Sequence, residues 1–290
     1  MSNDRDISPN ISIIGTRTCG KTTYLVALAR FPHKNEYPGL RVTAINNDAK
    51  ELVGMADNII AKGQATPPSS RDETRNYEFD IKIPQLTESI RLVVKDGGGE
   101  LFNDLALERK DWPPDIAGIK DEKGNQVTPG FVDELCKATG LIIMTDWIEE
   151  ADTKIYQPAL QNLLLELNFL ETANQNMPKK RIAVVMSKCE RGEAWTGRLD
   201  PGEDLFRLRM PETYKELQLP QHLPHRIEFF ACSSFGVLAD KDLRPNRLMG
   251  VDNDKREYAR LMDRRNWRPY GLLSPIYWLT TGRRYKDESL

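Results

Sequence analysis

Residues 11–24 read ISIIGTRTCGKTTY. A short apolar run ends at Gly15, four small or polar residues follow, and the stretch closes on Gly20, Lys21 and two threonines. This order predicts a buried strand at 11–15, a glycine-rich turn and a helix at 20–30. The backbone N–H groups of such a turn, at the start of a helix, form a site for an anion. We therefore expect a phosphate-binding loop in an α/β fold.

The loop from Gly15 to Thr22 matches the pattern G-x-x-x-x-G-K-[ST] without a gap. In this pattern the lysine, here Lys21, reaches the β- and γ-phosphates, and the Thr22 hydroxyl is a ligand of Mg²⁺. A glycine-rich turn with no ligand is the alternative, and the flanking strand and helix argue against it. The residues expected to contact the phosphates are Gly15, Thr16, Arg17, Thr18, Cys19, Gly20, Lys21, Thr22 and Thr23.

Apolar runs and helical periodicity alternate along the rest of the chain. This alternation predicts a three-layer α/β fold of the P-loop NTPase type, with a mostly parallel sheet and helices on both faces. We expect one domain over 1–290, with insertions at about 31–65, 101–135 and 190–225, the last two irregular and rich in Pro and Gly. The expected strands are 40–46, 77–83, 90–96, 140–146, 181–187 and 226–233, the last of these closing the sheet, and the expected helices are 48–62, 153–173 and 272–281.

The composition is that of an ordinary globular protein. The 290 residues are 39% hydrophobic and 29% charged, and the net charge of −2 favours neither nucleic acid nor an anionic membrane as a partner. No apolar run approaches the roughly 18 residues of a membrane span, and the polar N-terminus carries no signal-peptide core. The four cysteines show no C-x-x-C spacing and there are three histidines, so we expect reduced thiols in a cytoplasmic protein.

A second motif lies at residues 92–100, LVVKDGGGE. Asp96 is expected at the end of a buried strand and fits D-x-x-G together with Gly99. The carboxylate of Asp96 would hold the Mg²⁺ hydration shell opposite Thr22, and the Gly99 N–H would sense the γ-phosphate. Asp followed by glycines is often only a turn, so this assignment depends on the phosphate-binding loop.

A third motif, Ser187-Lys188-Cys189-Glu190, follows another buried strand and resembles the guanine-reading N/T-K-x-D of GTPases. A carboxylate there accepts two N–H groups of guanine, a match that adenine does not offer, and the Lys188 stem would cover the base. Ser in place of Asn and Glu in place of Asp depart from that pattern, and a polar strand-to-loop exit is the alternative. In FACSSF, Ser233 and Ser234 match the loop that backs the guanine in these proteins.

The order of these motifs, over about residues 11–282, resembles a Ras-like GTPase of the translation-factor-related class. The insertions and the ending GLLSPIYWL are more similar to the divergent bacterial double-GTPase families of conflict systems. This resemblance implies a switch that binds GTP and GDP with Mg²⁺ and signals to a protein effector or activating partner through 63–76 and 97–135. Its hydrolysis would be activated by a partner or by self-association. It also implies a switch threonine that ligates Mg²⁺, for which Thr74 is preferred and Thr66 is the alternative.

Two residues depart from the Ras-like pattern in ways that bear on catalysis. Glu100 stands where a glutamine positions the attacking water, and its charge near the γ-phosphate predicts slow hydrolysis. Arg17 is either an in-built arginine finger or a loop residue facing solvent. The residues expected to act in catalysis are Lys21, Glu100, Arg17 and Thr74. An ATPase or P-loop kinase, and a nucleotide-binding scaffold without hydrolysis, stay open as alternative functions.

The segment 255–268 is rich in Lys and Arg. We expect it to be a solvated helix face, because acidic residues are interspersed among the cations. A surface for an anionic partner is the alternative.

Overall fold

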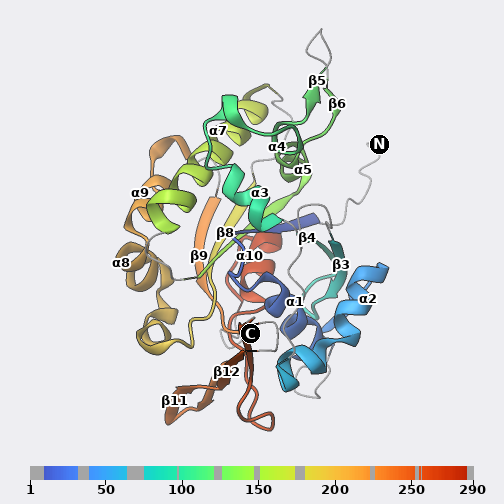
Figure 1. Cartoon of the computed structure of the whole chain (residues 1–290), viewed down its shortest axis with the longest axis vertical. Helices are drawn as coiled ribbons and strands as arrows, with labels where there is room; N and C mark the ends of the chain where they lie inside the picture. The colour runs from blue at the N-terminus through green and yellow to red at the C-terminus, as the bar shows by residue number, and fades with distance from the viewer. Residues whose placement is uncertain are drawn as a thin grey trace.

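Seven strands form the central sheet in the computed structural model of the chain (Figure 1). The structure describes residues 10–31, 39–63, 75–96, 98–120, 126–146, 151–173, 180–222, 226–251, 255 and 257–285. The strand order is β2-β3-β4-β1-β7-β8-β9. The strands are β1 (Asn10–Ile14), β2 (Arg41–Ala44), β3 (Arg75–Lys82), β4 (Ile90–Asp96), β7 (Gly140–Thr145), β8 (Arg181–Met186) and β9 (Arg226–Ala231).

The sheet is mostly parallel, as the sequence predicts. Strands β4, β1, β7, β8 and β9 are parallel to one another, whereas β3 pairs antiparallel with β4 and β2 pairs antiparallel with β3. All six residues of β7 are buried, which explains its continuous apolar sequence. Because the five parallel strands point the same way, the loops that follow them meet at one edge of the sheet.

Helices cover both faces of the sheet, so the predicted three layers are confirmed. Successive residues of β1 point to opposite faces: Ile13 belongs to one core and Ile14 to the other. The first core packs against α1 (Lys21–Arg30), α2 (Asn47–Gly54), the π-helical η2 (Asp57–Lys62) and α10 (Ser274–Thr281). The second packs against α3 (Gly98–Asp104), α5 (Phe131–Lys137), α7 (Gln157–Ala173) and α9 (Pro211–Leu217).

The segments 101–135 and 190–225 are not irregular, and that expectation was wrong. They hold η3 (Arg109–Asp111), α4 (Pro114–Ala117), α5, η5 (Gly192–Leu199), η6 (Gly202–Phe206), α8 (Arg207–Arg209), α9 and η7 (Pro220–His222). Pro114 and Pro211 each stand in the first turn of a helix, where proline starts a helix instead of breaking it. The second segment also supplies core residues, because the Phe206 ring packs 4.9 Å from the ring of Phe229 on β9.

Strand β9 is the last strand of the central sheet, but four short strands follow it. They pair as β10 (Val237–Ala239) with β11 (Asp242–Pro245), and β12 (Arg247–Val251) with β13 (Glu257–Leu261). The expectation of a helix face at 255–268 was therefore wrong. Tyr258 explains the strand: its ring lies against Gly63 and Gly250, where an added Cβ would come within 2.4 and 2.5 Å of it. Such cross-strand packing overrides a charge pattern read from sequence alone.

Short antiparallel strand pairs project from opposite ends of the molecule. Figure 1 shows β5 (Ile119–Lys120) and β6 (Gln126–Thr128) at one end, and the β11 and β12 region at the other. The central sheet and its helices lie between them. Among the described residues, no helix is both long and apolar enough to cross a membrane.

Candidate functional site

The loop between β1 and α1 has the backbone of an anion site. Gly15 has φ +152°, and an added Cβ would lie 2.0 Å from the Met144 carbonyl oxygen of β7, so only glycine fits there. Thr18 and Gly20 also adopt positive φ, at 66° and 97°. Gly20 is the N-cap of α1, and the first turn of that helix contains no acidic residue. The positive end of the helix is therefore electrostatically suited to a phosphate.

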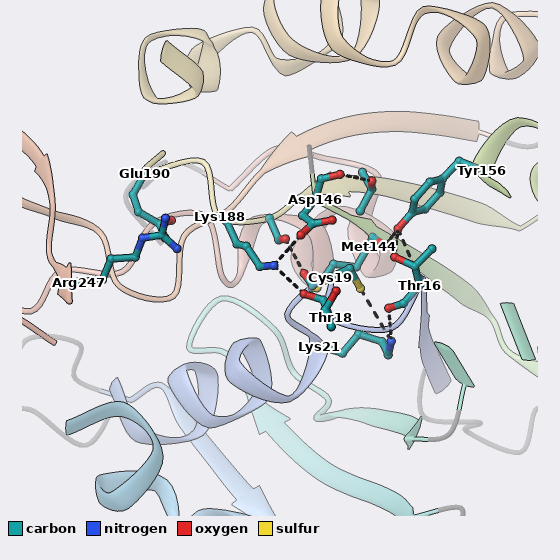
Figure 2. A network of polar contacts seen from close by, with 12 residues as sticks. Thr16, Thr18, Cys19, Lys21, Met144, Asp146, Tyr156, Lys188, Glu190 and Arg247 are labelled. Atoms are coloured by element: carbon teal, nitrogen blue, oxygen red, sulfur yellow. Dashed lines mark hydrogen bonds and ion pairs between the residues drawn. The ribbon is translucent and has the colours of Figure 1, made fainter. Parts of the chain in front are cut away.

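Lys21 lies buried beneath this loop, with 6% of its surface exposed. Its Nζ donates to the carbonyl oxygens of Gly15 at 2.9 Å and Thr16 at 2.8 Å, and lies 3.8 Å from the sulfur of Cys19 (Figure 2). The cation thus stabilises the curved loop through its own carbonyl groups. Burial raises the pKa of the Cys19 thiol, which stays protonated beside the ammonium group.

The predicted base-reading motif touches the phosphate-binding loop directly. Ser187 Oγ donates to the Cys19 carbonyl oxygen at 2.5 Å. Lys188 Nζ donates to the Thr18 carbonyl oxygen and to Asp146 Oδ2, both at 2.6 Å (Figure 2). The ends of β1 and β8 are therefore bound to each other through these side chains, although 168 residues separate Ser187 from Cys19.

Asp146 was not identified from the sequence. It follows β7, is 3% exposed, and neutralises the Lys188 ammonium within the site. The sequence carries a signal that could have revealed it, because GLIIMTD ends a fully apolar strand in an acid. A buried carboxylate of this kind requires a cationic partner.

Tyr156 was also missed, and its hydroxyl contacts the loop at Thr16. It lies 2.8 Å from Thr16 Oγ1, accepts from the Thr16 N–H at 3.4 Å, and donates to the Met144 carbonyl oxygen at 3.1 Å (Figure 2). Burial is the main cause that raises the pKa of Tyr156, so the hydroxyl stays protonated and able to donate. No sequence pattern indicates this tyrosine, because its position depends on the π-helical turn η4 (Asp152–Tyr156).

Glu190 extends away from the loop, beyond Lys188, toward Arg247 of β12 (Figure 2). The carboxylate is 1% exposed, and its Oε1 lies 3.6 Å from Arg247 Nε. Burial lowers the pKa of Arg247, and the Glu190 charge opposes that shift. Within the described part of the chain, Glu190 Oε2 is buried without a hydrogen-bond partner. Such a buried acceptor, left unsatisfied by the residues that the structure describes, is suited to a donor from a ligand.

Ser233 and Ser234 lie on the loop after β9, next to the base-reading motif. The two loops are joined by a hydrogen bond from the Cys189 N–H to the Cys232 carbonyl oxygen at 3.1 Å. Ser233 is fully buried, and its Oγ accepts from the Gly236 N–H at 2.7 Å, so its hydroxyl shapes its own turn. The side chain of Ser234 is half-buried, which leaves it the more accessible of the pair.

The start of α3 packs on the phosphate-binding loop. An added Cβ at Gly99 would lie 2.6 Å from the Arg17 amide nitrogen, so the close approach requires glycine. Arg17 and Glu100, the two unusual residues of the sequence, form an ion pair with Nη1 and Oε1 3.6 Å apart. Asp96 closes β4 at the sheet edge where β1 also ends.

Thr66 and Thr74, the two candidates for the switch threonine, lie outside the described residues. Thr22 and Thr23 lie in the first turn of α1, and both are half-buried. The structure thus brings together the loop, the start of α3 and the motif after β8. The assignment of individual roles to these residues stays a prediction.

Residues 12–124 match the sequence model of the family described as Double-GTPase 1. Among curated proteins, no sequence match is found.

Several solved structures are similar in part. The GTP-bound Ski7 GTPase-like domain of S. cerevisiae is 13% identical with a TM-score of 0.40, and the alignment covers 78% of this chain and 43% of that one. The SAR1 small COPII coat GTPase of Encephalitozoon cuniculi, in complex with GDP, is 15% identical with a TM-score of 0.37, over 78% of this chain and 69% of that one. The signal recognition particle receptor SRb-GTP/SRX complex of Chaetomium thermophilum is 15% identical with a TM-score of 0.38, and the alignment covers 79% of this chain and 92% of that one.

Proposed function

We propose that this chain, whose residues 12–124 match the family described as Double-GTPase 1, is a switch that binds GTP and GDP with Mg²⁺ and hydrolyses GTP slowly. The contact of Ser187 and Lys188 with the phosphate-binding loop carries this proposal. Because it joins a motif suited to a guanine base to a loop suited to phosphates, one nucleotide can bridge both.

The phosphates would occupy the loop at the start of α1. Their charge is matched by the N-terminal end of the helix, by the loop N–H groups and by the Lys21 ammonium. In the bound state, Lys21 would exchange part of its contact with the loop carbonyls for phosphate oxygens. Its burial makes that exchange favourable, because a cation in a low-dielectric site attracts an anion strongly.

The residues at this sheet edge fit a magnesium ion. Thr22, in the first turn of α1, and Asp96, at the end of β4, would supply a hydroxyl and a carboxylate. The described residues contain no group of three or more His, Cys, Asp or Glu that could hold a metal by themselves. Mg²⁺ held by few protein ligands, phosphates and water needs no such group. The ion would neutralise the charge that develops on the transferred phosphoryl group.

The base would lie on the side of Lys188 that faces Glu190. Oε2 of Glu190 is a buried acceptor without a partner among the described residues, and it would accept an N–H of guanine. Ser234 would line the same region. Adenine offers a ring acceptor where guanine offers a donor, so this carboxylate would select against it.

Hydrolysis would be slow without a partner. Glu100 would place a carboxylate beside the terminal phosphate, and the repulsion between them would raise the barrier to hydrolysis. Arg17 lies within 3.6 Å of that carboxylate and would offset part of the charge. Segments 63–76 and 97–135 would carry the signal to an effector or activating protein, because the γ-phosphate orders such segments.

Nucleotide binding and single-turnover hydrolysis test this function. The wild-type chain should bind labelled GTP in Mg²⁺, lose affinity when the metal is chelated, and hydrolyse GTP more slowly than about 1 per second. Lys21→Ala is the control for the phosphate site and should bind GTP much more weakly. Turnover in the range of metabolic kinases, or equal binding by Lys21→Ala, would contradict the proposal.

A further inference from the structure

Tyr156 stands between the phosphate-binding loop and α3. Its hydroxyl bonds Thr16 and Met144, and its ring lies 5.2 Å from the ring of Phe102 on α3. Tyr156 is 1% exposed and Phe102 is 0% exposed. One side chain therefore contacts both the loop and the helix that follows D-x-x-G.

The opposite side of Thr16 is held by the phosphate-binding lysine. Lys21 Nζ donates to the Thr16 carbonyl oxygen, while the Thr16 N–H and hydroxyl face the Tyr156 oxygen. The contacts run without a gap from Phe102 through Tyr156 and Thr16 to Lys21. Close-packed interiors transmit a displacement along such a chain because their side chains have no free volume to absorb it.

Tyr156 is itself fixed by its own element. It ends the π-helical turn η4, whose Asp152 accepts from the Glu212 and Thr213 N–H groups at the start of α9. Single π-helical turns recur at functional sites, where they redirect a side chain. The adjoining helix α7 also holds the end of α3, since Asn162 donates to the carbonyl oxygens of Leu105 and Leu107 at 2.7 and 2.9 Å.

We propose that Tyr156 is a positioning residue that couples α3 to the phosphate-binding loop. This inference rests on the proposed function and deepens it. A γ-phosphate that contacts Gly99 shifts the start of α3. Phe102 moves with this helix and displaces the Tyr156 ring. The Tyr156 hydroxyl then changes the position of Thr16 and, through it, of Lys21. Tyr156 thereby lets the protein distinguish a triphosphate from a diphosphate.

The substitution Tyr156→Phe tests this coupling, because it keeps the ring on Phe102 and removes the bond to Thr16. Affinities for GDP and for a non-hydrolysable GTP analogue are measured with Mg²⁺. We expect the analogue to bind about five- to tenfold more weakly, the effect of one lost hydrogen bond, while GDP affinity changes less. Tyr24→Phe is the matched control: Tyr24 is also 1% exposed, and its hydroxyl donates to the Leu272 carbonyl oxygen at 2.5 Å on the other face of the sheet.

Amide hydrogen exchange of residues 98–105 provides a second measurement. If Tyr156 had a purely structural role, its substitution would not change how the exchange rate of this segment depends on the nucleotide. In the wild type and in Tyr24→Phe, the GTP analogue should slow exchange in this segment more than GDP does. In Tyr156→Phe that difference should disappear. Phe102→Leu combined with Tyr156→Phe should be no worse than Tyr156→Phe alone, because both act through one path.

The measurements distinguish a structural role of Tyr156 from a coupling role. If Tyr156→Phe and Tyr24→Phe both lower the unfolding temperature while the ratio of analogue to GDP affinity keeps its wild-type value, Tyr156 is structural only and the inference is overturned. If the wild type itself binds no guanine nucleotide, the proposed function fails, and the inference fails with it. If the ratio of analogue to GDP affinity falls in Tyr156→Phe and not in Tyr24→Phe, the result supports both the proposed function and the coupling role of Tyr156.

Discussion

Arg17 and Glu100 are a half-exposed ion pair between the phosphate-binding loop and α3. Their side chains are 54% and 39% exposed, and the atoms are 3.6 Å apart. Exposed pairs of this kind contribute little to stability, typically below about 1 kcal/mol. Their importance is therefore expected in the proposed reaction, where the charge of Glu100 would repel a phosphate.

Replacing Glu100 by glutamine should speed hydrolysis. Glu100→Gln removes the repulsion and keeps a group able to orient water, so we expect about a tenfold rise in the single-turnover rate, as about 1.4 kcal/mol of barrier would give. The unfolding temperature should stay within about 2 °C of the wild type. Glu193→Gln is the control and should leave the rate unchanged, because this exposed carboxylate pairs with Arg209 outside the site. An unchanged or slower rate in Glu100→Gln would refute a repulsive role for this carboxylate.

The pair of Glu190 and Arg247 differs because it is buried, with side chains 1% and 14% exposed. Arg247→Met leaves the carboxylate buried and unpaired, so it should lower the free energy of unfolding by about 3 kcal/mol, as measured by urea denaturation. The double variant Glu190→Gln/Arg247→Met removes both charges and should recover most of that loss. A single variant as stable as the wild type would show that the pair does not hold this part of the fold.

At the scale of elements, the contact of α3 with the loop depends on Gly99. In Gly99→Ala the new methyl group would lie 2.6 Å from the Arg17 nitrogen, so the helix and loop must separate. We expect at least about tenfold weaker binding of a GTP analogue, since about 1.4 kcal/mol of lost contact is enough.

The matched control for that change is Gly54→Ala at the end of α2, where an added Cβ meets nothing within 4 Å. It should keep wild-type binding and leave stability equal to the wild type or slightly higher, by up to about 1 kcal/mol. If Gly99→Ala and Gly54→Ala bind the GTP analogue equally in a fluorescence titration, nucleotide binding does not depend on the close contact between α3 and the loop at Gly99.

The elements themselves were predictable wherever their own pattern decides them. The ends of three strands lie within about one residue of the predicted ends, for 90–96, 140–146 and 181–187. Parallel strands that are buried on both faces have continuous apolar sequences, which makes them easy to predict. The helices of 190–225 were missed because their prolines and glycines read as loop signals. Strand β13 was missed because Tyr258 and its glycine neighbours meet only in the folded chain.

All four thiols of the molecule are buried, and none of them forms a disulfide. Burial raises the pKa of Cys19, Cys189 and Cys232. The folded state therefore holds these protons at a pH where the unfolded chain releases them. Stability from these groups is complete below the unfolded pKa, about 8.5, and falls as pH rises above it.

We accordingly expect the free energy of unfolding to decline between pH 8.5 and 10, by up to about 1.4 kcal/mol per pH unit for each thiol ionised only in the unfolded chain. Urea denaturation across this range measures it. Cys189→Ala should make the decline shallower than in the wild type, whereas a decline of the same slope in both would assign the effect to other groups. Thiol titration of the native protein at pH 8 should detect far fewer groups than titration in urea.

The site as a whole was predictable to the extent that sheet topology gathers its parts. The loop after β1 and the motif after β8 follow parallel strands, so their meeting at one edge follows from the fold. Tyr156 and Asp146 could not be assigned in the same way, because their roles arise from tertiary contacts with Thr16 and Lys188. Arg247 belongs to a hairpin that the sequence pattern did not indicate.

Competition between nucleotides tests whether Glu190 selects guanine over adenine. The purified chain is titrated in Mg²⁺ with labelled GTP, and unlabelled ATP and GTP compete for the site; Glu190→Ala and Glu190→Asn are titrated in parallel. A guanine-reading carboxylate predicts that GTP competes at least about a hundredfold better than ATP, and that both variants lose this preference while still binding triphosphate. ATP competing as well as GTP, or a guanine preference untouched by either variant, would contradict the account.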